Sequence, residues 1–437
     1  MPISTDTPPA ATLSDRLPSR AFVLSAVGVL LLALWGFHWL TSWKQNHLKK
    51  SPKPWLSRYE YFGIDFLHNY FAARYWANGG DPFREPFGDP IPPPHTRKLV
   101  YPPIVIPVFA WCALVDDPRT AVGVWMLALV SFATLGGIAA WKARRNLGLS
   151  DVPLSMVLVV VLVNAPFAFA LERGNYDLLV VPLALAAVLG LNKRQIAGDV
   201  LAGACLALAV GLKAYPGVLV AGLIPLRRWR ALALTLAFGA AFVAYRFDDL
   251  QVAATNLKEL SDTHDPETHY KDVIPNPEDR HPLPNTHSIT ASWYTVWAHT
   301  KLSALARIPS AVASGLICCS MFVWIAVLAY RCPNPAPALV PLALWAVALG
   351  TFVPKVANDY SLVFLPMAAA AVWDRRDPPA VHAALGFAVV VLQPVAFQLS
   401  PTVAFGAKVA AVIAVGWCLA ARLKALAAHP APAPESH

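Results

Sequence analysis

Charged residues are scarce in this chain of 437 residues, where Asp, Glu, Lys and Arg together make up only 14%. A soluble globular protein usually carries about 25% charged residues. Apolar residues reach 57%, and the mean hydropathy is +0.49. The chain has too few charges to cover a soluble core of this size, so the composition excludes an ordinary soluble globular protein.

Cysteine pairs and the motifs of many soluble enzymes are also missing. None of the six cysteines forms a C-x-x-C pair, and all lie in or beside apolar segments, which is typical of small buried residues. The sequence has no Walker loop, G-x-S-x-G elbow, zinc motif or dinucleotide fingerprint. We therefore expect no metal site, no cofactor and no nucleic-acid partner, with a divalent cation as the alternative.

Apolar runs of about 16 to 22 residues recur along the chain. A helix of this length crosses a hydrocarbon layer roughly 30 Å thick, and a helix pairs all of its backbone groups internally. We therefore predict an all-α polytopic membrane protein with about twelve transmembrane helices, within a range of ten to thirteen. The predicted spans are 21–41, 120–141, 153–170, 176–191, 197–212, 214–226, 231–247, 307–330, 338–353, 359–373, 380–398 and 402–421.

Short basic segments alternate with less basic junctions from Trp141 to the C-terminus. Lys and Arg in short loops favour the cytoplasm, so this alternation predicts an inner (plasma) membrane protein with both termini inside. The basic segments are 142–145, 192–194, 226–230, Arg331, 374–376 and 422–424.

The remaining segments follow from this topology. Residues 101–115 contain three prolines, which interrupt a helix, so we predict a half-buried helix on the outer face rather than a span. We expect a membrane domain over 20–425, with Pro- and Ala-rich disordered ends. The predicted segments are the ends 1–19 and 426–437, a first outer loop 43–119 carrying juxtamembrane helices, and a long outer loop 248–306.

Polar residues gather on the predicted outer face. Ionisable groups at membrane depth are unfavourable and usually line a cavity, so their convergence predicts a basic pocket there. The candidate cations are Lys213, Lys355, Arg173 and His287. The candidate substrate-binding residues are His68, Asn69, Tyr70, Asn175, Tyr215, Asn358, Asp359 and Tyr360.

Each candidate also has a simpler explanation. Lys213 and Lys355 could extend from helix ends toward water. Arg173 could pair with Glu172 or Asp177 as a structural tie. Asn358-Asp359 could cap a helix. His287 lies in a segment rich in Pro, Asp and Glu, where a solvated loop is the default.

Asp65 stands among aromatic residues after the first apolar run. A helix over 64–77 would place Asp65, His68 and Asn69 on one face. Phe66 and Tyr70 would share another face, suited to the membrane surface. The alternatives are that Asp65 caps this helix and that the aromatics form an interfacial belt.

Four segments of the chain, taken in order, resemble glycosyltransferase family 87 of the C-type membrane glycosyltransferases. This family includes the mycobacterial mannosyltransferase that elongates phosphatidylinositol mannosides. The resemblance covers roughly residues 20–425. It is carried by GIDFLHNYFAARYWANGGDPF (63–83), LVYPP (99–103), RGNYDLLVVPLALA (173–186) and GLKAYPGVLVAGLIPLRRWRA (211–231).

The resemblance implies a C-type fold, a polyprenyl-phosphate-linked sugar donor and a catalytic Asp in the first outer loop. By position, Asp65 would be the base. Ile64 precedes Asp65, where some C-type families have an acidic pair, and this departure weakens the case for a bound metal.

The implied chemistry is coherent with the polar residues. A lipid phosphate leaves without needing a proton and needs only cationic stabilisation, whereas the acceptor hydroxyl needs a positioned base. Direct displacement with one base inverts the anomeric carbon.

We therefore predict an inverting hexosyltransferase of the cell envelope that works among membrane lipids. It would transfer a sugar, with mannose as the best guess, to a lipid, glycan or protein acceptor on the non-cytoplasmic face. A transporter or lipid-linked sugar flippase is the alternative function, and a non-catalytic assembly scaffold is the third.

Overall fold

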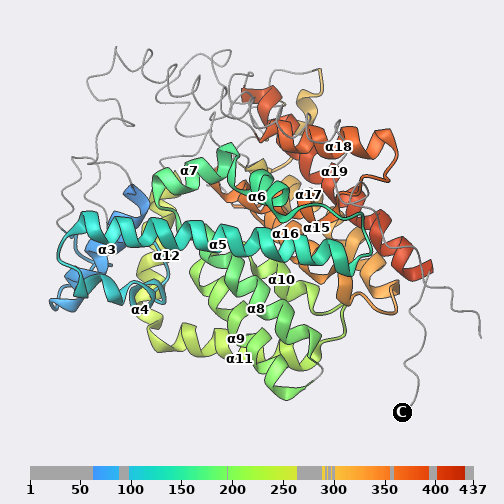
Figure 1. Cartoon of the computed structure of the whole chain (residues 1–437). Coiled ribbons are helices and arrows are strands. Elements are labelled where there is room, and N and C mark those ends of the chain that lie inside the picture. Colours follow the sequence, from blue (N-terminus) through green and yellow to red (C-terminus); the bar gives the residue numbers. More distant parts are fainter. Residues whose placement is uncertain are drawn as a thin grey trace, which may run out of the picture.

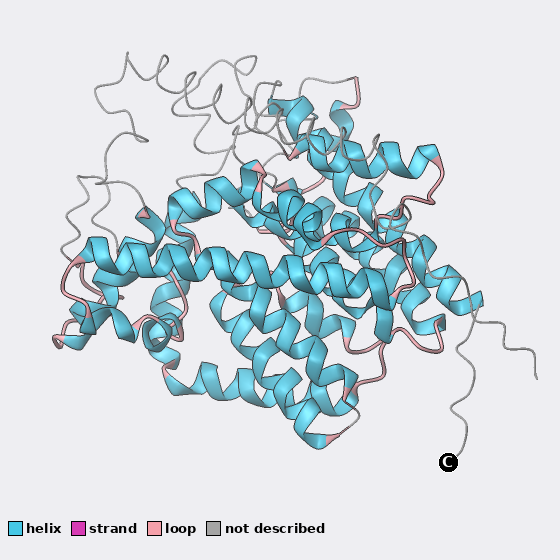
Figure 2. Ribbon diagram, in the orientation of Figure 1, coloured by secondary structure: helices cyan, strands magenta, loops and turns pink. Residues whose placement is uncertain are grey.

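The structure is a computed structural model that describes residues 63–87, 98–193, 195–262, 288–290, 293, 297, 301–354, 359–392 and 401–428. Every regular element in these ranges is a helix (Figure 2). The all-α prediction is therefore confirmed for this part of the chain. The predicted span 21–41 and the predicted disordered segment 1–19 lie outside the described residues.

The elements keep one numbering throughout, in which α denotes an α-helix and η a 3-10 helix (Figure 1). In chain order they are α3 (Ile64–Ala77), α4 (Val105–Val108), η2 (Ala110–Leu114), α5 (Pro118–Asn146), α6 (Leu154–Leu162), α7 (Ala165–Arg173), η3 (Tyr176–Leu179), α8 (Val180–Asn192), α9 (Ile196–Leu212), α10 (Gly217–Gly222), α11 (Trp229–Tyr245), α12 (Phe247–Asp262), η5 (Ser303–Arg307), α15 (Ser310–Arg331), η6 (Ala336–Ala338), α16 (Leu339–Gly350), η7 (Asp359–Val363), α17 (Phe364–Val372), α18 (Pro379–Val391) and α19 (Pro401–Ala428).

Helix α5 runs across the molecule with α3 beside its N-terminal end (Figure 1). Asp117 caps it by accepting hydrogen bonds from the backbone N–H groups of Arg119 and Thr120, and Pro118 occupies the first turn, where proline is tolerated. At 29 residues the helix is about 43 Å long, which is enough to cross a bilayer. Helix α5 therefore links two ends of the bundle.

Helices α16 and α17 form the centre of the bundle. Helix α17 is buried along its whole length, and α16 is buried from Ala343 onward. Both pack against α5 and α19, and the Trp345 indole donates a hydrogen bond of 3.0 Å to the carbonyl oxygen of Val412. Such all-round apolar helices belong in an interior, and they fix the position of the helices around them.

Three described helices are long and apolar enough to cross a membrane, namely α5, α15 and residues 405–428 of α19. Two bent pairs, α6–α7 at 61° and α11–α12 at 88°, raise this number to five if each pair counts as one span. The apolar helices support a membrane protein, and a number of spans between ten and thirteen stays a prediction.

One expected span was wrong, and one expected loop contains a helix. Residues 214–226 contain only the six-residue α10 followed by turns, about 9 Å of helix, so they do not form a helical span. Pro225 lies inside that segment and interrupts it. The expected outer loop 248–306 begins with α12, a helix that we did not predict.

Residues 101–115 do not form a span, as we predicted. They form two short helices, α4 and η2, which pack against α3. The three prolines in and before α4 explain why no longer helix forms. The segment is therefore a support for α3.

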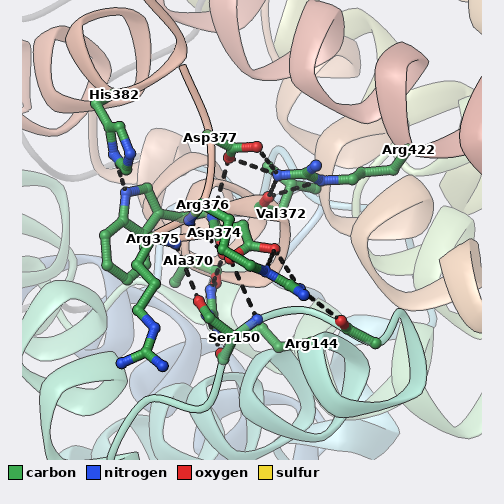
Figure 3. Close-up of polar contacts among 12 residues, drawn as sticks. Arg144, Ser150, Ala370, Val372, Asp374, Arg375, Arg376, Asp377, His382 and Arg422 are labelled. Atoms are coloured by element: carbon green, nitrogen blue, oxygen red, sulfur yellow. Dashed lines mark hydrogen bonds and ion pairs between the residues drawn. The ribbon is translucent and has the colours of Figure 1, made fainter. Parts of the chain in front are cut away.

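A cluster of arginines and aspartates ties the far end of α5 to the C-terminal helices (Figure 3). The buried Arg144 guanidinium donates hydrogen bonds of 3.1 Å to the carbonyl oxygen of Ala370 and 2.9 Å to that of Ser150. Burial raises the pKa of Asp374, but hydrogen bonds from Arg376 and Ser150 outweigh this effect and lower it overall.

Arg422 adds helix α19 to the same cluster. Its guanidinium donates to the carboxylate of Asp377 at 2.7 Å and to the carbonyl oxygen of Val372 at 3.0 Å (Figure 3). Helices α5, α17 and α19 are thereby joined at the end of α5 that is remote from α3.

We predict that Arg144→Met destabilises the fold. The change leaves buried carbonyl oxygens without a donor, and breaking a buried charged network typically costs about 3–5 kcal/mol. The measurement is the midpoint of thermal unfolding of the detergent-solubilised protein. Arg145→Met is the matched control, since Arg145 is the next residue and exposed. Equal shifts in both variants would contradict the structural role of Arg144.

Candidate active site

Two glycine-containing turns place the candidate site. The backbone N–H of Gly63 donates a hydrogen bond of 2.8 Å to the carbonyl oxygen of Glu172. Gly63 and Gly174 have φ angles of 78° and 63°, a left-handed conformation that favours glycine. A Cβ atom on Gly174 would lie only 2.8 Å from the Cβ of Phe66. The start of α3 and the turn after α7 therefore meet at van der Waals distance.

This contact brings Asp65 to its partners. Its Oδ1 accepts a hydrogen bond of 2.6 Å from Arg173 Nη2, and its Oδ2 accepts one of 2.7 Å from Asn175 Nδ2. The Asp65 side chain is only 11% exposed. A carboxylate oxygen has two acceptor positions, so each oxygen keeps one for a further donor. The carboxylate is fixed but still able to accept a proton.

The structure excludes one alternative for Asp65 and changes one for Arg173. Helix α3 is capped by Gly63 and Asp65 lies in its first turn, so Asp65 is not the helix cap. Arg173 forms its ion pair with Asp65. The alternative that Arg173 is a structural tie had named Glu172 or Asp177 as its partner. Its contact with a donor phosphate stays a prediction.

Lys213 follows the C-terminus of α9 and points among aromatic rings. Its Nζ lies 2.9 Å from Asp177 Oδ1, 4.5 Å from the centroid of the Tyr176 ring and 5.2 Å from that of Tyr101. The side chain is only 16% exposed. Lys213 therefore provides a positive charge inside the protein, held by a carboxylate and by cation–π contacts.

Asp177 connects Lys213 to the Asp65 clamp. It is fully buried, and its Oδ2 accepts a short hydrogen bond from the Ser361 hydroxyl of η7. Its backbone N–H donates a hydrogen bond of 2.9 Å to Asn175 Oδ1. Since the Asn175 oxygen is occupied in this way, its amide nitrogen faces Asp65. One network thus joins Asp65, Asn175, Asp177 and Lys213.

Aromatic residues form another wall of this network. Tyr101 lies edge-on to Tyr176 with the ring centroids 5.2 Å apart, and the half-buried His68 lies 6.3 Å from Tyr101. Burial raises the pKa of Tyr101, and the charge of Lys213 only partly opposes this shift. We did not predict Tyr101, although it stands in the quoted segment LVYPP.

The aromatic face of α3 differs from expectation. Phe66 and Tyr70 are buried in the protein core, so the expectation that they lie on the membrane surface was wrong. Phe66 stacks on Trp125 with ring centroids 5.5 Å apart. The Tyr70 hydroxyl lies 2.7 Å from the carbonyl oxygen of Val115, which favours a structural role for Tyr70 over substrate binding.

Asn69 lies on the face of α3 that carries Asp65. Its Nδ2 donates a hydrogen bond of 2.9 Å to the backbone carbonyl oxygen of Asp65. Its Oδ1 is buried and accepts no hydrogen bond from any residue that the structure describes. A buried acceptor of this kind normally has a partner, and a substrate hydroxyl would supply one.

The remaining predicted residues are placed only in part. Tyr215 is half-buried two residues after Lys213. Helix η7, which begins at Asp359 and includes Tyr360, brings Ser361 to Asp177. His287, Lys355 and Asn358 lie outside the described residues. The neighbouring residues Ser288 and Pro354 meet, because the Ser288 hydroxyl donates a short hydrogen bond to the Pro354 carbonyl oxygen. Among the described residues, no three His, Cys, Asp or Glu side chains are grouped to hold a metal ion.

Comparison with known proteins adds one match. Residues 99–255 match the model of glycosyltransferase family 87, which confirms the resemblance to that family and supports glycosyltransferase activity. The matched segment contains Tyr101, Arg173, Asn175 and Lys213, whereas Asp65 precedes it. No curated protein and no solved structure matches the chain.

We predict that Gly174→Ala destabilises the fold. A left-handed conformation costs an alanine about 1–2 kcal/mol, and the new methyl group would also collide with Phe66. The measurement is the thermal unfolding midpoint. Gly123→Ala is the control, because a Cβ on Gly123, within α5, has no neighbour within 4 Å. An unchanged midpoint in Gly174→Ala would contradict the close contact between the two turns.

Proposed function

From the family 87 match over residues 99–255, we propose that the protein is an inverting glycosyltransferase that uses a polyprenyl-phosphate-linked sugar. The sugar, with mannose as the expected one, passes to a lipid, glycan or protein acceptor. The observation that carries this proposal is the clamp of Arg173 and Asn175 on the Asp65 carboxylate. The clamp fixes one carboxylate in a network that also holds the cation Lys213.

Asp65 acts as the general base. The acceptor hydroxyl becomes a strong nucleophile only as its proton is removed, and a positioned carboxylate contributes typically 10²–10⁴-fold to such a step. Arg173 and Asn175 hold both oxygens, so the base does not have to be oriented when the acceptor arrives. Arg173 is thus a positioning residue for Asp65.

Lys213 is the described cation that supports the departing phosphate. Negative charge develops on the phosphate oxygens as the sugar leaves, and a preorganised cation in a shielded site stabilises it strongly. Lys213 is preorganised by Asp177 and by the rings of Tyr101 and Tyr176. Lys355 and His287 are proposed as further phosphate ligands.

Inversion is the proposed outcome because Asp177, the carboxylate that the network joins to Asp65, is engaged elsewhere. A retaining double displacement needs a second carboxylate as nucleophile, about 5 Å from the first. Asp177 is fully buried and engaged by Lys213 and Ser361, which removes it from that role. Direct attack by the acceptor, with Asp65 taking the proton, is the simpler course.

The arrangement of charges supports an active site on the non-cytoplasmic face. The site lies at the N-terminal end of α5, whereas Arg144, Arg376 and Arg422 gather at the other end. Basic residues in short loops favour the cytoplasm. We therefore propose an inner (plasma) membrane enzyme of the cell envelope, with both termini in the cytoplasm and membrane lipids around it.

We predict that Asp65→Asn lowers turnover at least about 100-fold, because Asn keeps the shape of Asp but is a very weak base. The assay follows labelled mannose from polyprenyl-phosphate mannose to an acceptor in membranes. Asp151→Asn, which changes an exposed carboxylate at the far end, is the control. Retained activity in Asp65→Asn would remove Asp65 from the role of base. Vectorial movement of an unmodified lipid-linked sugar, without transfer, would favour a flippase.

We predict that Lys213→Met raises the KM for the donor as well as lowering kcat, because Lys213 faces the donor phosphate in both the bound and the transition state. Asp65→Asn should leave the donor KM nearly unchanged. Steady-state kinetics with varied donor separates the two effects. Lys193→Met serves as the control, because Lys193 is exposed near the opposite end of α9. An unchanged donor KM in Lys213→Met would exclude Lys213 as a phosphate ligand.

A further inference from the structure

An apolar groove lies among α8, α10, α15 and α16, away from the candidate active site. Its lining consists of apolar side chains and glycine among the described residues, and its cavity volume is about 50 Å³. Apolar side chains of α15 that do not line the groove are exposed, among them Val323 and Val327. The groove therefore lies next to an exposed apolar surface. Representative lining residues are Val188, Leu219, Phe322, Ala326 and Ala343.

A basic pocket continues this groove and shares Leu191, Leu226 and Leu339 with it. Its polar wall includes Arg227, Arg228 and Arg230, and Asp199 is the one acid in its lining. Arg228 neutralises Asp199 through an ion pair of 2.9 Å. The pocket is therefore left with the charges of Arg227 and Arg230, neither of which has an acidic partner among the described residues.

Arg227 is held in place in the lining of this pocket. It has a φ of 55°, the one positive value among the described residues other than glycine. Its guanidinium carbon lies 4.4 Å from the centroid of the Tyr330 ring of α15. A strained backbone conformation persists where the surroundings determine it, and such positions often have a role in binding. Here it holds a cation against Tyr330 in the lining of the basic pocket.

The pocket lies far from Lys213. Arg228 bonds to Asp199 and to the carbonyl oxygen of Lys193, beside the N-terminus of α9, whereas Lys213 follows its C-terminus. Helix α9 has 17 residues, so the two ends are about 25 Å apart. The basic pocket is therefore separate from the donor phosphate site proposed above.

We propose that the groove and the basic pocket together bind one anionic phospholipid from the leaflet opposite the active site. The phosphate contacts Arg227 and Arg230, and one segment of an acyl chain enters the groove. An apolar slot that ends in unpaired arginines is complementary to an anionic amphiphile, and basic pockets between transmembrane helices bind lipid head groups in this way. Trp229, 59% exposed beside the pocket, suits the interface between head groups and chains.

The test uses the full-length protein in detergent and native mass spectrometry with phosphatidylglycerol or phosphatidylcholine of identical acyl chains. We expect the wild type to bind phosphatidylglycerol at least about 10-fold more tightly than phosphatidylcholine. The double variant R227Q/R230Q should lose this preference. The control R145Q/K193Q removes two exposed charges outside the pocket and should keep it. Arg228 is left unchanged because it pairs with Asp199.

A second variant tests the groove. Ala343→Phe adds a ring to the groove wall and should weaken the binding of both phospholipids. Equal binding of phosphatidylglycerol by wild type and R227Q/R230Q would overturn the proposal. A competition with polyprenyl phosphate could also overturn it. If polyprenyl phosphate displaces the phospholipid from the wild type and from R227Q/R230Q, but not from Ala343→Phe, the groove holds the donor chain instead. Sugar transfer by the Asp65 site is assayed separately, so either proposal can fail alone.

Discussion

The close approach of Gly63 and Gly174 is the constraint on which the candidate site depends. Any side chain at Gly174 would hold the two turns apart, and Asp65 would then lose contact with Arg173 and Asn175. The Trp125 indole donates a hydrogen bond of 2.8 Å to the Gly174 carbonyl oxygen, so α5 supports the same turn. A backbone contact thus determines where a carboxylate stands, which is a more rigid arrangement than side chains alone provide.

The two ends of α5 use charge in different ways. At the far end, Arg144 and its neighbours are satisfied mostly by backbone carbonyl oxygens and aspartates, so the charges close the bundle. At the near end, Asp65 keeps acceptor capacity, and Asn69 Oδ1 is buried without a described partner. Polar groups that are held in place but incompletely satisfied favour binding over mere stability.

The helical membrane class and the helix over 64–77 could be predicted from the sequence, because both depend on composition and on the spacing of nearby residues. It was not enough for the role of Arg173, because its partner Asp65 lies 108 residues away and no pattern in a single sequence shows that contact. Tyr101 was missed for the same reason, because its place in the site depends on its contact with the distant Lys213. The predicted span 214–226 was wrong because the segment is apolar but contains Pro225, which interrupts a helix. Helix α12 was missed because its first turn carries Asp248 and Asp249, and charged residues of this kind are also common in loops.

The network from Lys213 to Asp65 links the two halves of the proposed reaction. A phosphate that approaches Lys213 competes with Asp177 for the ammonium group, and Asp177 also accepts from Ser361 and orients Asn175 through its backbone N–H. Because Asn175 Nδ2 holds one oxygen of Asp65, any shift of Asp177 reaches the base through a single amide. Hydrogen-bonded groups in a low dielectric polarise one another. In the proposed reaction, the arrival of the donor at Lys213 is therefore coupled to the Asp65 base through Asp177 and Asn175.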